Sequence, residues 1–175
     1  LDAIGNAYDF QTSSIPVAGS VAADLDGRTT IHARETRFNL DVRAVKRFRA
    51  FFEGDFYGDK NAFRLRHAYG EYGRLLGGQT WSTFQDISAR PLTVDFEGPD
   101  AEVFVRQPMI RYTHPISEQW TWAIAVEDPE PQFAVPGTLT GTQRSELPDV
   151  PTYIRYGAKR GHAQLAAIYR QIRFD

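Results

Sequence analysis

The sequence predicts an all-β fold, an antiparallel up-and-down meander of about nine strands that forms a single partial β-barrel domain over residues 1–175. Three observations indicate this fold. Apolar and charged residues alternate with a period of two, as in strands whose two faces differ in polarity. Long and short connections between the expected strands are distributed as in membrane barrels. Helical periodicity is absent, which argues against an α/β fold.

The clearest alternation covers residues 47–57, and Phe51 is its one exception. One face carries Phe48, Ala50, Phe52, Gly54 and Phe56, and the other carries Arg47, Arg49, Glu53, Asp55 and Tyr57. A soluble sandwich turns its apolar face to a core and its polar face to water. A membrane barrel turns its apolar face to lipid and its charged face to a wet lumen. The alternation alone leaves both folds open.

The other strands are expected from similar alternation between turn signals. They cover 1–10, 30–43, 62–72, 75–81, 103–113, 119–127 and 151–157, and a last strand begins near residue 162. The chain begins and ends on strand-like residues and has no starting Met. We therefore expect it to be a piece of a longer barrel, truncated at both ends.

The connections favour the membrane barrel. Long connections cover 11–28, 82–102 and 128–150, and short ones cover 44–46, 58–61, 73–74, 114–117 and 157–161. In a meander all three long connections lie at one end. Outer-membrane barrels have long external loops and short periplasmic turns, whereas a sandwich does not require this asymmetry. The sequence therefore predicts an outer-membrane protein in contact with lipid.

Composition excludes several other classes. The chain of 175 residues carries a net charge of −2, so no general nucleic-acid binding is expected. The absence of cysteine excludes disulfides and thiolate metal sites. The four histidines, His32, His67, His114 and His162, stand at no metal-ligand spacing. We expect no metal, no cofactor and no enzymatic activity.

Arginine dominates the cations, with seventeen arginines and three lysines. GC-rich codon usage explains such a bias as well as function does. Arginine nevertheless stays charged in any environment and binds carboxylates with two parallel hydrogen bonds. The predicted pore-lining residues are Arg47, Arg49, Arg64, Arg66, Arg111 and Arg155, and the side chains expected to face outward are Phe48, Phe52, Phe56, Trp120, Trp122, Ile124 and Tyr156.

The run FRLRHAYGEYGRLLGGQTWSTFQD, together with FFEGDFYG before it and RQPMIRY after it, resembles the DcaP-like family of outer-membrane porins of Gram-negative bacteria. The opening LDAIGNAYDF resembles that family's first barrel strand. The resemblance implies a homotrimer of sixteen-stranded barrels that passes small anionic solutes, dicarboxylates among them. This chain then forms roughly the N-terminal half of one barrel. His67 departs from the pattern because alternation places it toward lipid; a subunit contact or a different register explains it.

The resemblance also implies that the connection 82–102 folds into the lumen, as the third loop of porins does. Its expected constriction residues are Asp86, Arg90, Asp95 and Glu97. The carboxylates either form the wall opposite the arginines or pack the loop down. Arginine rings select for anions, so the sequence predicts an arginine track for small carboxylates.

Three alternatives stay open at this point. The arginines neutralise neighbouring carboxylates such as Glu53, Asp55 and Glu71, which leaves a weakly selective pore. The chain is a soluble β-sandwich ligand-binding module. The chain is a β-rich hydrolase that uses paired carboxylates, since two residues at i and i+2 on a strand lie about 6.5–7 Å apart. No catalytic constellation supports the hydrolase.

Overall fold

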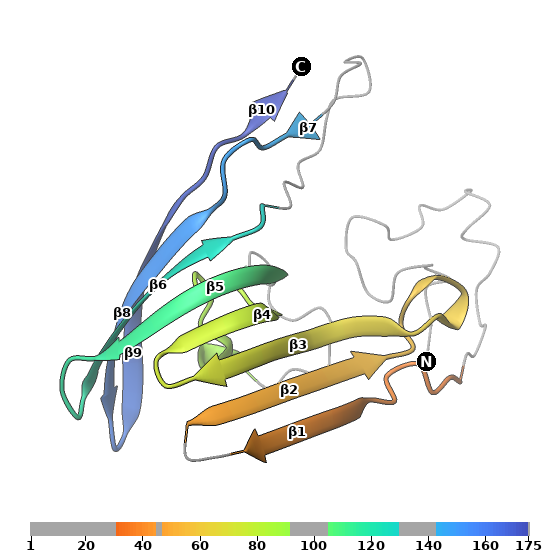
Figure 1. The fold of residues 1–175 in the computed structure, drawn as a ribbon, viewed down its shortest axis with the longest axis horizontal. Coiled ribbons are helices and arrows are strands. Elements are labelled where there is room, and N and C mark those ends of the chain that lie inside the picture. The colour runs from red at the N-terminus through yellow and green to blue at the C-terminus, as the bar shows by residue number, and fades with distance from the viewer. Residues whose placement is uncertain (1–30, 45–46, 92–104, 130–142, 175) are drawn as a thin grey trace, which may run out of the picture.

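The computed structural model describes residues 31–44, 47–91, 105–129 and 143–174. Eight strands form one antiparallel sheet in the order β1-β2-β3-β4-β5-β6-β8-β9 (Figure 1). Their bounds are β1 Phe38–Ala44, β2 Phe48–Asp55, β3 Arg64–Tyr72, β4 Leu75–Trp81, β5 Arg106–Pro115, β6 Trp120–Glu127, β8 Val150–Ala158 and β9 Gly161–Tyr169. This confirms the predicted all-β antiparallel meander.

Two short strands, β7 (Gln143–Arg144) and β10 (Arg173–Phe174), form a second small sheet. They precede β8 and follow β9, so they prolong that hairpin beyond the main sheet (Figure 1). The described residues also contain two 3-10 turns, η3 (Asp59–Asn61) and η4 (Ile87–Ala89). The strand predicted over 1–10 and the loop predicted over 11–28 lie outside the described residues.

Several predicted strand bounds were wrong. The strand predicted over 30–43 begins only at Phe38, because the chain turns just before it, with the Thr36 amide donating to the Ala33 carbonyl at 3.1 Å. The strand predicted over 103–113 is β5 and continues to Pro115. The turn predicted from residue 114 therefore begins two residues later, where the amides of Ile116 and Ser117 donate to the Trp120 carbonyl.

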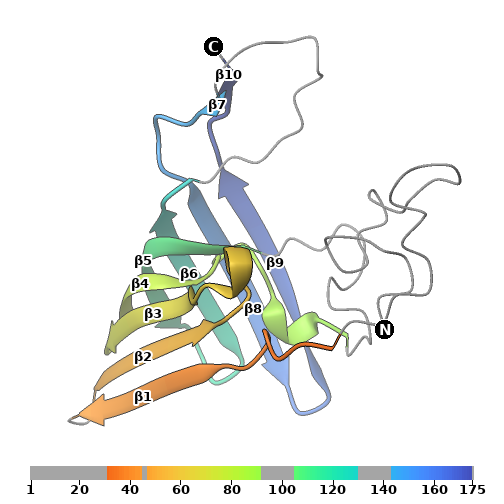
Figure 2. The ribbon, with the colours of Figure 1, turned by 90° about the vertical axis from the view of Figure 1, so that its right-hand side faces the viewer.

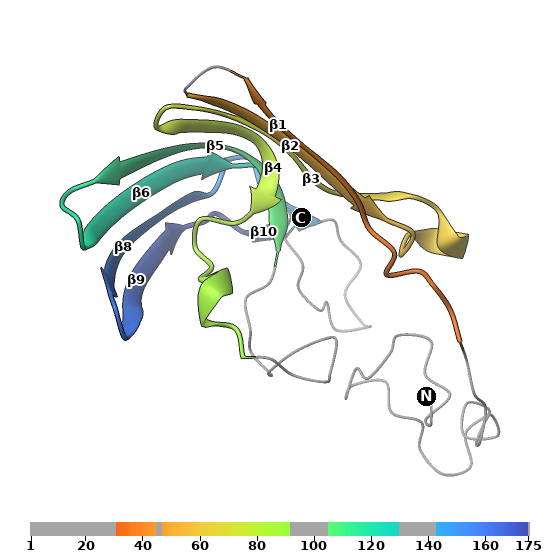
Figure 3. The ribbon, with the colours of Figure 1, turned by 90° about the horizontal axis from the view of Figure 1, so that it is seen from below.

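The sheet is strongly curved and has a concave and a convex face (Figures 2 and 3). One end of it, here called the short-turn end, carries the connections β1–β2, β3–β4, β5–β6 and β8–β9. The other, the long-loop end, carries the connections from β4 to β5 and from β6 to β8. The described parts of two predicted long loops therefore leave from one end, as expected.

Burial on the two faces is the reverse of that in a soluble protein. The described residues bury only four hydrophobic side chains, Leu76, Met109, Ala123 and Ala125. The buried polar residues are Asp55, Arg66, His67, Thr80, Ser82, Thr83, Gln107, Glu127 and Asp149. Water solvates charges and excludes apolar surface, so this arrangement fits a sheet with a polar interior and a lipid-facing exterior.

Cross-strand partners share a face, which assigns the strand side chains. Most large apolar residues that register places together on the convex face are exposed, while Trp122, Ile124 and Tyr156, which were predicted to face outward, lie on the same face and are half-buried. The exposed residues are Phe38, Leu40, Val42, Phe48, Phe52, Leu65, Tyr72, Leu75, Ile110, Trp120, Val126, Ile154, Leu165 and Tyr169. The described strands form no second packed layer to cover them, which disfavours the soluble sandwich.

Convex aromatic rings gather toward both ends of the strands. Toward the long-loop end, Phe56 lies edge-on to Phe38 and Phe63 with ring centroids 5.9 Å apart in each pair. At the short-turn end, the rings of Trp120 and Tyr156 are 5.0 Å apart. Membrane barrels carry such aromatic girdles at the two water–lipid boundaries, with an apolar band between them.

A β-bulge in β3 corrects the expected facing of His67. The register between β2 and β3 shifts between Glu53, which pairs with His67, and Gly54, which pairs with Leu65. Arg66 is the extra residue. His67 consequently faces the concave side, where its Nδ1 lies 3.0 Å from the Thr80 hydroxyl and its side chain is buried. Counting with a period of two could not reveal the bulge.

We expect Ile110→Arg to destabilise the membrane-inserted protein by about 2–4 kcal/mol, because Ile110 lies on the convex face of β5, 68% exposed, between Gly77 and Val126. The measurement is a urea titration of the protein from its complete coding sequence in lipid vesicles. Thr113→Arg is the matched control, since Thr113 lies on the concave face of the same strand. Equal losses in both variants would contradict the facing.

Candidate pore-lining face

The concave face carries rows of residues that cross the sheet from strand to strand. One row, read off the strand register, consists of Arg43, Arg49, Glu71, Leu76, Arg111 and Ala125. The next row toward the long-loop end consists of Asp41, Phe51, Tyr69, Gly78, Met109 and Glu127. Phe51 thus lies on the concave face, as the alternation requires. It is an apolar residue on a face that is otherwise expected to be polar.

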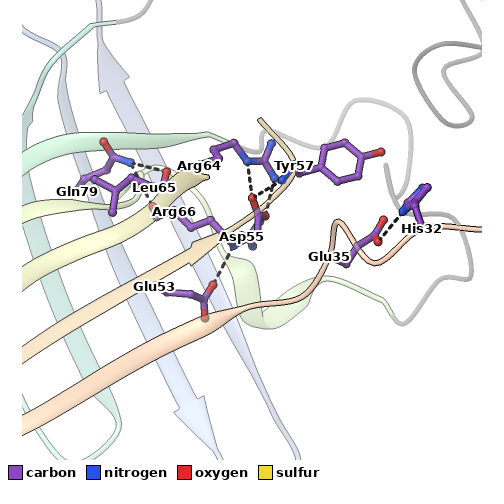
Figure 4. A network of polar contacts seen from close by, with 9 residues as sticks. All are labelled: His32, Glu35, Glu53, Asp55, Tyr57, Arg64, Leu65, Arg66 and Gln79. Atoms are coloured by element: carbon purple, nitrogen blue, oxygen red, sulfur yellow. Dashed lines mark hydrogen bonds and ion pairs between the residues drawn. The ribbon is translucent and has the colours of Figure 1, made fainter. Parts of the chain in front are cut away.

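Asp55 is the centre of a buried ion network (Figure 4). Its carboxylate accepts hydrogen bonds from Arg64 Nε and Nη2 at 3.0 and 2.7 Å and from Arg66 Nη1 at 3.0 Å. The Tyr57 amide donates to it as well, at 3.1 Å. Arg66 Nε also donates to Glu53 at 2.9 Å. Two predicted pore-lining arginines therefore lie together, each bound to carboxylates.

Arg49 is bound in a similar way nearer the short-turn end. Its Nε and Nη2 donate to Asp41 at 2.9 and 3.2 Å, and its Nη1 lies 3.5 Å from Glu71. Its guanidinium also lies over the rings of Phe51 and Tyr69, at 5.2 and 5.7 Å from their centroids. A cation is attracted to the negative face of an aromatic ring. This arginine is held in place from several sides.

The connection after β4 folds back across the concave face. Glu127, which is fully buried on β6, accepts hydrogen bonds from the Ser82 hydroxyl and the Thr83 amide, both at 2.7 Å. The segment then runs to η4, which lies inside the curve of the sheet (Figure 3). The described part of this loop, residues 82–91, therefore lies within the concavity, as expected for a constriction loop.

Asp86 fastens the far end of this segment. Its carboxylate lies 2.8 Å from His162 Nε2 and accepts from Arg155 Nη1 at 3.3 Å. Arg155 Nη2 donates to the Ser88 hydroxyl at 2.7 Å, and that hydroxyl donates to Asp86 at 2.6 Å. Arg155 and His162 lie beside the β8–β9 turn, so the loop reaches from the long-loop end nearly to the opposite end of the sheet. We call these four residues the Asp86 anchor.

The anchor also sets the charge of Asp86. Burial alone raises the pKa of this carboxyl, but the hydrogen bond from Ser88, the charge of Arg155 and the contact with His162 outweigh burial. The net pKa lies below the usual value for aspartate, so Asp86 is ionised at neutral pH. A charged carboxylate binds a guanidinium more strongly than a neutral acid does. The anchor is therefore strongest when Asp86 is ionised.

A large cavity of about 1360 Å³ opens at the short-turn end. Its lining includes Arg43, Arg47, Arg49, Arg74 and Arg111, with Glu71 as the one carboxylate. Arg43 and Arg49 bind Asp41, and Arg74 contacts His114 at 2.8 Å. The side chains of Arg47 and Arg111 make no hydrogen bond or ion pair in the part of the chain that the structure describes. The short-turn end of the sheet therefore carries an excess of positive charge, and residues of both faces line its cavity, since Phe48, Tyr72 and Leu75 of the convex face belong to the lining.

The predicted site residues therefore fall into separate groups. Arg64 and Arg66 meet at Asp55, Arg155 meets Asp86, and Arg49 binds Asp41. Arg90 ends η4 and is half-buried. Arg47 and Arg111 line the cavity. Asp95 and Glu97 lie outside the described residues.

The candidate site residues from the sequence did not include Asp41, Glu127 or His162. Asp41 could have been found, because it alternates with Phe38, Leu40 and Val42 on its strand. Glu127 ends a strand whose other concave residues are Thr121, Ala123 and Ala125, which do not mark it as special. His162 gains its importance only from the loop, which comes from 76 residues away in the chain.

The described residues hold no group of three or more histidine, aspartate or glutamate side chains that could bind a metal ion. Among the same residues, no helix is both long and apolar enough to span a membrane.

No protein family and no curated protein matches the sequence. Among solved structures, the chain is similar to the outer membrane channel DcaP of Acinetobacter baumannii, with 26% sequence identity and a TM-score of 0.71. The similarity covers 81% of this chain and 42% of that chain. The present chain thus spans less than half the length of the channel it resembles.

The similarity and the observed sheet together show that the chain has the fold of part of a porin barrel. They support a porin-like role and an outer-membrane location. An identity of 26% does not establish membership of the DcaP-like family. The solute, the oligomeric state and the selectivity stay predictions.

Proposed function

We propose that this chain forms part of an outer-membrane porin of a Gram-negative bacterium, related to the DcaP-like channels, through which small anionic solutes such as dicarboxylates diffuse passively. The supporting observation is the reversed burial of the sheet. Nine polar or charged side chains are buried while most large apolar residues of the convex face are exposed. A lipid exterior and a wet interior stabilise both arrangements, which supports the proposal.

The mechanism that we propose is electrostatic and involves no covalent step or cofactor. The inward loop narrows the lumen, and the arginines of the concave face raise the local concentration of anions. A low-dielectric wall behind them focuses the field. Arginine or lysine rings favour anions in other pores. The solute gradient supplies the driving force, and the protein is not an enzyme.

The proposal also covers the assembly. Lipid contacts the convex face, and the complete protein forms a homotrimer of sixteen-stranded barrels in which this chain supplies about half of the strands. The exposed apolar surface supports the lipid contact. Among the described residues no further strand pairs with the outer edges of β1 and β9, which supports the need for further strands. Backbone groups cannot stay unpaired in lipid.

A weakly selective pore is the second candidate, and one observation favours it. Arg49, Arg64, Arg66 and Arg155 all bind carboxylates, so much of the charge on this face is neutralised. The cavity at the short-turn end, with its excess of arginine, favours the selective pore instead.

Reversal potentials in planar bilayers test the proposed function. The protein from its complete coding sequence is inserted under a salt gradient, and the anion-to-cation permeability ratio is measured. We expect a passive pore that prefers anions. A pore that prefers cations would overturn anion selectivity. A protein that stays soluble without detergent and forms no pore would favour the ligand-binding module.

A further inference from the structure

The structure divides the arginines of the concave face into those bound to carboxylates and those that are not. Arg64 and Arg66 share the buried Asp55, and Arg49 is held by Asp41. The charge of a guanidinium that is bound to a carboxylate is compensated, so it attracts a passing anion less strongly. These arginines shape the face but leave little capacity to bind an anion.

Arg111 differs from them. It lies in the middle of β5, opposite Leu76 on one side and Ala125 on the other. Its Nε is buried and makes no hydrogen bond within the described part of the chain. A buried donor without an acceptor is costly, and an acceptor that reaches it is correspondingly favoured. Glu71 lies two strands away in the same row, roughly 10 Å at normal strand spacing.

Space for a ligand lies beside Arg111. Its cross-strand neighbour Ala125 is only 2% exposed and does not line this space, whereas Thr113 and Thr121, toward the short-turn end, do. The cavity of about 1360 Å³ includes Arg111 in its lining, so the room is continuous with the short-turn end of the sheet.

Hydroxyl groups line the same cavity as Arg111. Thr113 follows Arg111 on the same face of β5, and its cross-strand row contains Ala123 and then Tyr153. Thr113, Thr121 and Tyr153 all line the cavity. A guanidinium that offers parallel donors, with hydroxyls beside it, matches the planar oxygens of a carboxylate.

We infer that Arg111, assisted by the hydroxyls of Thr113 and Tyr153, is a binding site for one carboxylate group of the transported solute. The site lies toward the short-turn end of the lumen, and it determines which organic anions are held during passage. This inference rests on the proposed function and deepens it. Arg64 and Arg66 then stabilise the concave face through Asp55 and bind no solute.

The test measures block of the chloride current by succinate in planar bilayers, with the protein from its complete coding sequence. We expect Arg111→Gln to raise the apparent Kd for succinate by roughly tenfold or more, as for loss of a hydrogen-bonded charged group. Arg111→Lys keeps the charge but not the paired donors, so its Kd should lie between that of the unmodified protein and that of Arg111→Gln. Tyr153→Phe, which removes one hydroxyl, should raise the Kd by a smaller factor.

Arg43→Gln is the matched control, because Arg43 lines the same cavity but is bound to Asp41 with a side chain that is 73% exposed. Its Kd should rise much less than that of Arg111→Gln, because its loss weakens only the general attraction of anions. An unchanged Kd in Arg111→Gln, or an equal rise in Arg43→Gln, overturns the site while anion selectivity stands. A parent pore without anion preference overturns the proposed function and the site together. If the Arg111→Gln variant does not insert into the bilayer, the Arg111→Lys variant alone tests the site. An unchanged Kd for succinate in that variant overturns the site.

Discussion

Replacing Asp86 with Ala is expected to raise the single-channel conductance of the pore. The Asp86 anchor joins the loop after β4 to Arg155 and His162 across the concave face. Hydrogen bonds to charged groups contribute about 1.5–3 kcal/mol each, so losing one shifts the loop equilibrium by roughly one to two powers of ten. The loop then leaves the lumen for a larger part of the time, which widens the narrowest section.

Planar-bilayer recordings measure this effect as conductance and as the frequency of transitions between levels. Asp59→Ala is a suitable control, because Asp59 is an exposed carboxylate on the β2–β3 connection at the long-loop end. It should leave the conductance unchanged. Identical recordings from both variants would show that the anchor does not hold the loop.

The same anchor predicts how the loop responds to acid. The pKa of Asp86 is lowered in the folded loop, so its contribution is fully present above the unfolded pKa and is lost as the pH falls through the folded one. The conductance should therefore rise only below about pH 4, where free aspartate is protonated. Asp86→Ala should lack this rise. A rise of the same size in the variant would assign the acid response to another group.

Asp55→Ala is expected to cause the largest loss of folding stability, about 3–5 kcal/mol, the usual cost of removing one partner from a buried ion pair. Asp55 is 1% exposed and accepts hydrogen bonds from Arg64, Arg66 and the Tyr57 amide. Without Asp55, the buried guanidinium of Arg66 keeps only its hydrogen bond to Glu53. Arg64 can turn toward water, since 35% of its side chain is exposed.

Urea titration in lipid vesicles, followed by tryptophan fluorescence, measures this loss. Asp41→Ala is the matched control: it also removes a carboxylate that binds two arginines, but one with 31% of its side chain exposed. Its effect should be much smaller, because water replaces the lost contacts. Arg64→Ala should leave folding nearly intact, since Asp55 keeps Arg66. Equal losses in the Asp55 and Asp41 variants would refute the buried network.

Much of the fold could be predicted because its signals are local. Residues 75–81 match β4 in both bounds, and residues 62–72 match β3 within two residues. Side chains on successive strand residues point to opposite faces, so alternation reports the facing directly. The facing of His67 was wrong because one bulged residue reverses the count beyond it. No residue type next to Arg66 in the sequence predicts the bulge.

The partners of the candidate site residues could not be predicted in the same way. Asp55 lies nine residues from Arg64 and meets it through a hairpin, but Asp86 and Arg155 are separated by 69 residues. Which carboxylate lies beside which arginine depends on strand register and on the path of the loop. Neither is encoded in the period of the sequence.

The amino-acid sequence by itself determined the meander, the two faces of the strands and the arginine-rich composition, because period-two alternation and turn residues act over a few positions. Only the tertiary structure decided which arginines are paired with a carboxylate and which are not. Register brings Asp55 to Arg64 and Arg66 and leaves Arg111 beside Ala125. The field in a lumen depends on charges that lie close together in space, and curvature of the sheet brings together residues that are far apart in the chain.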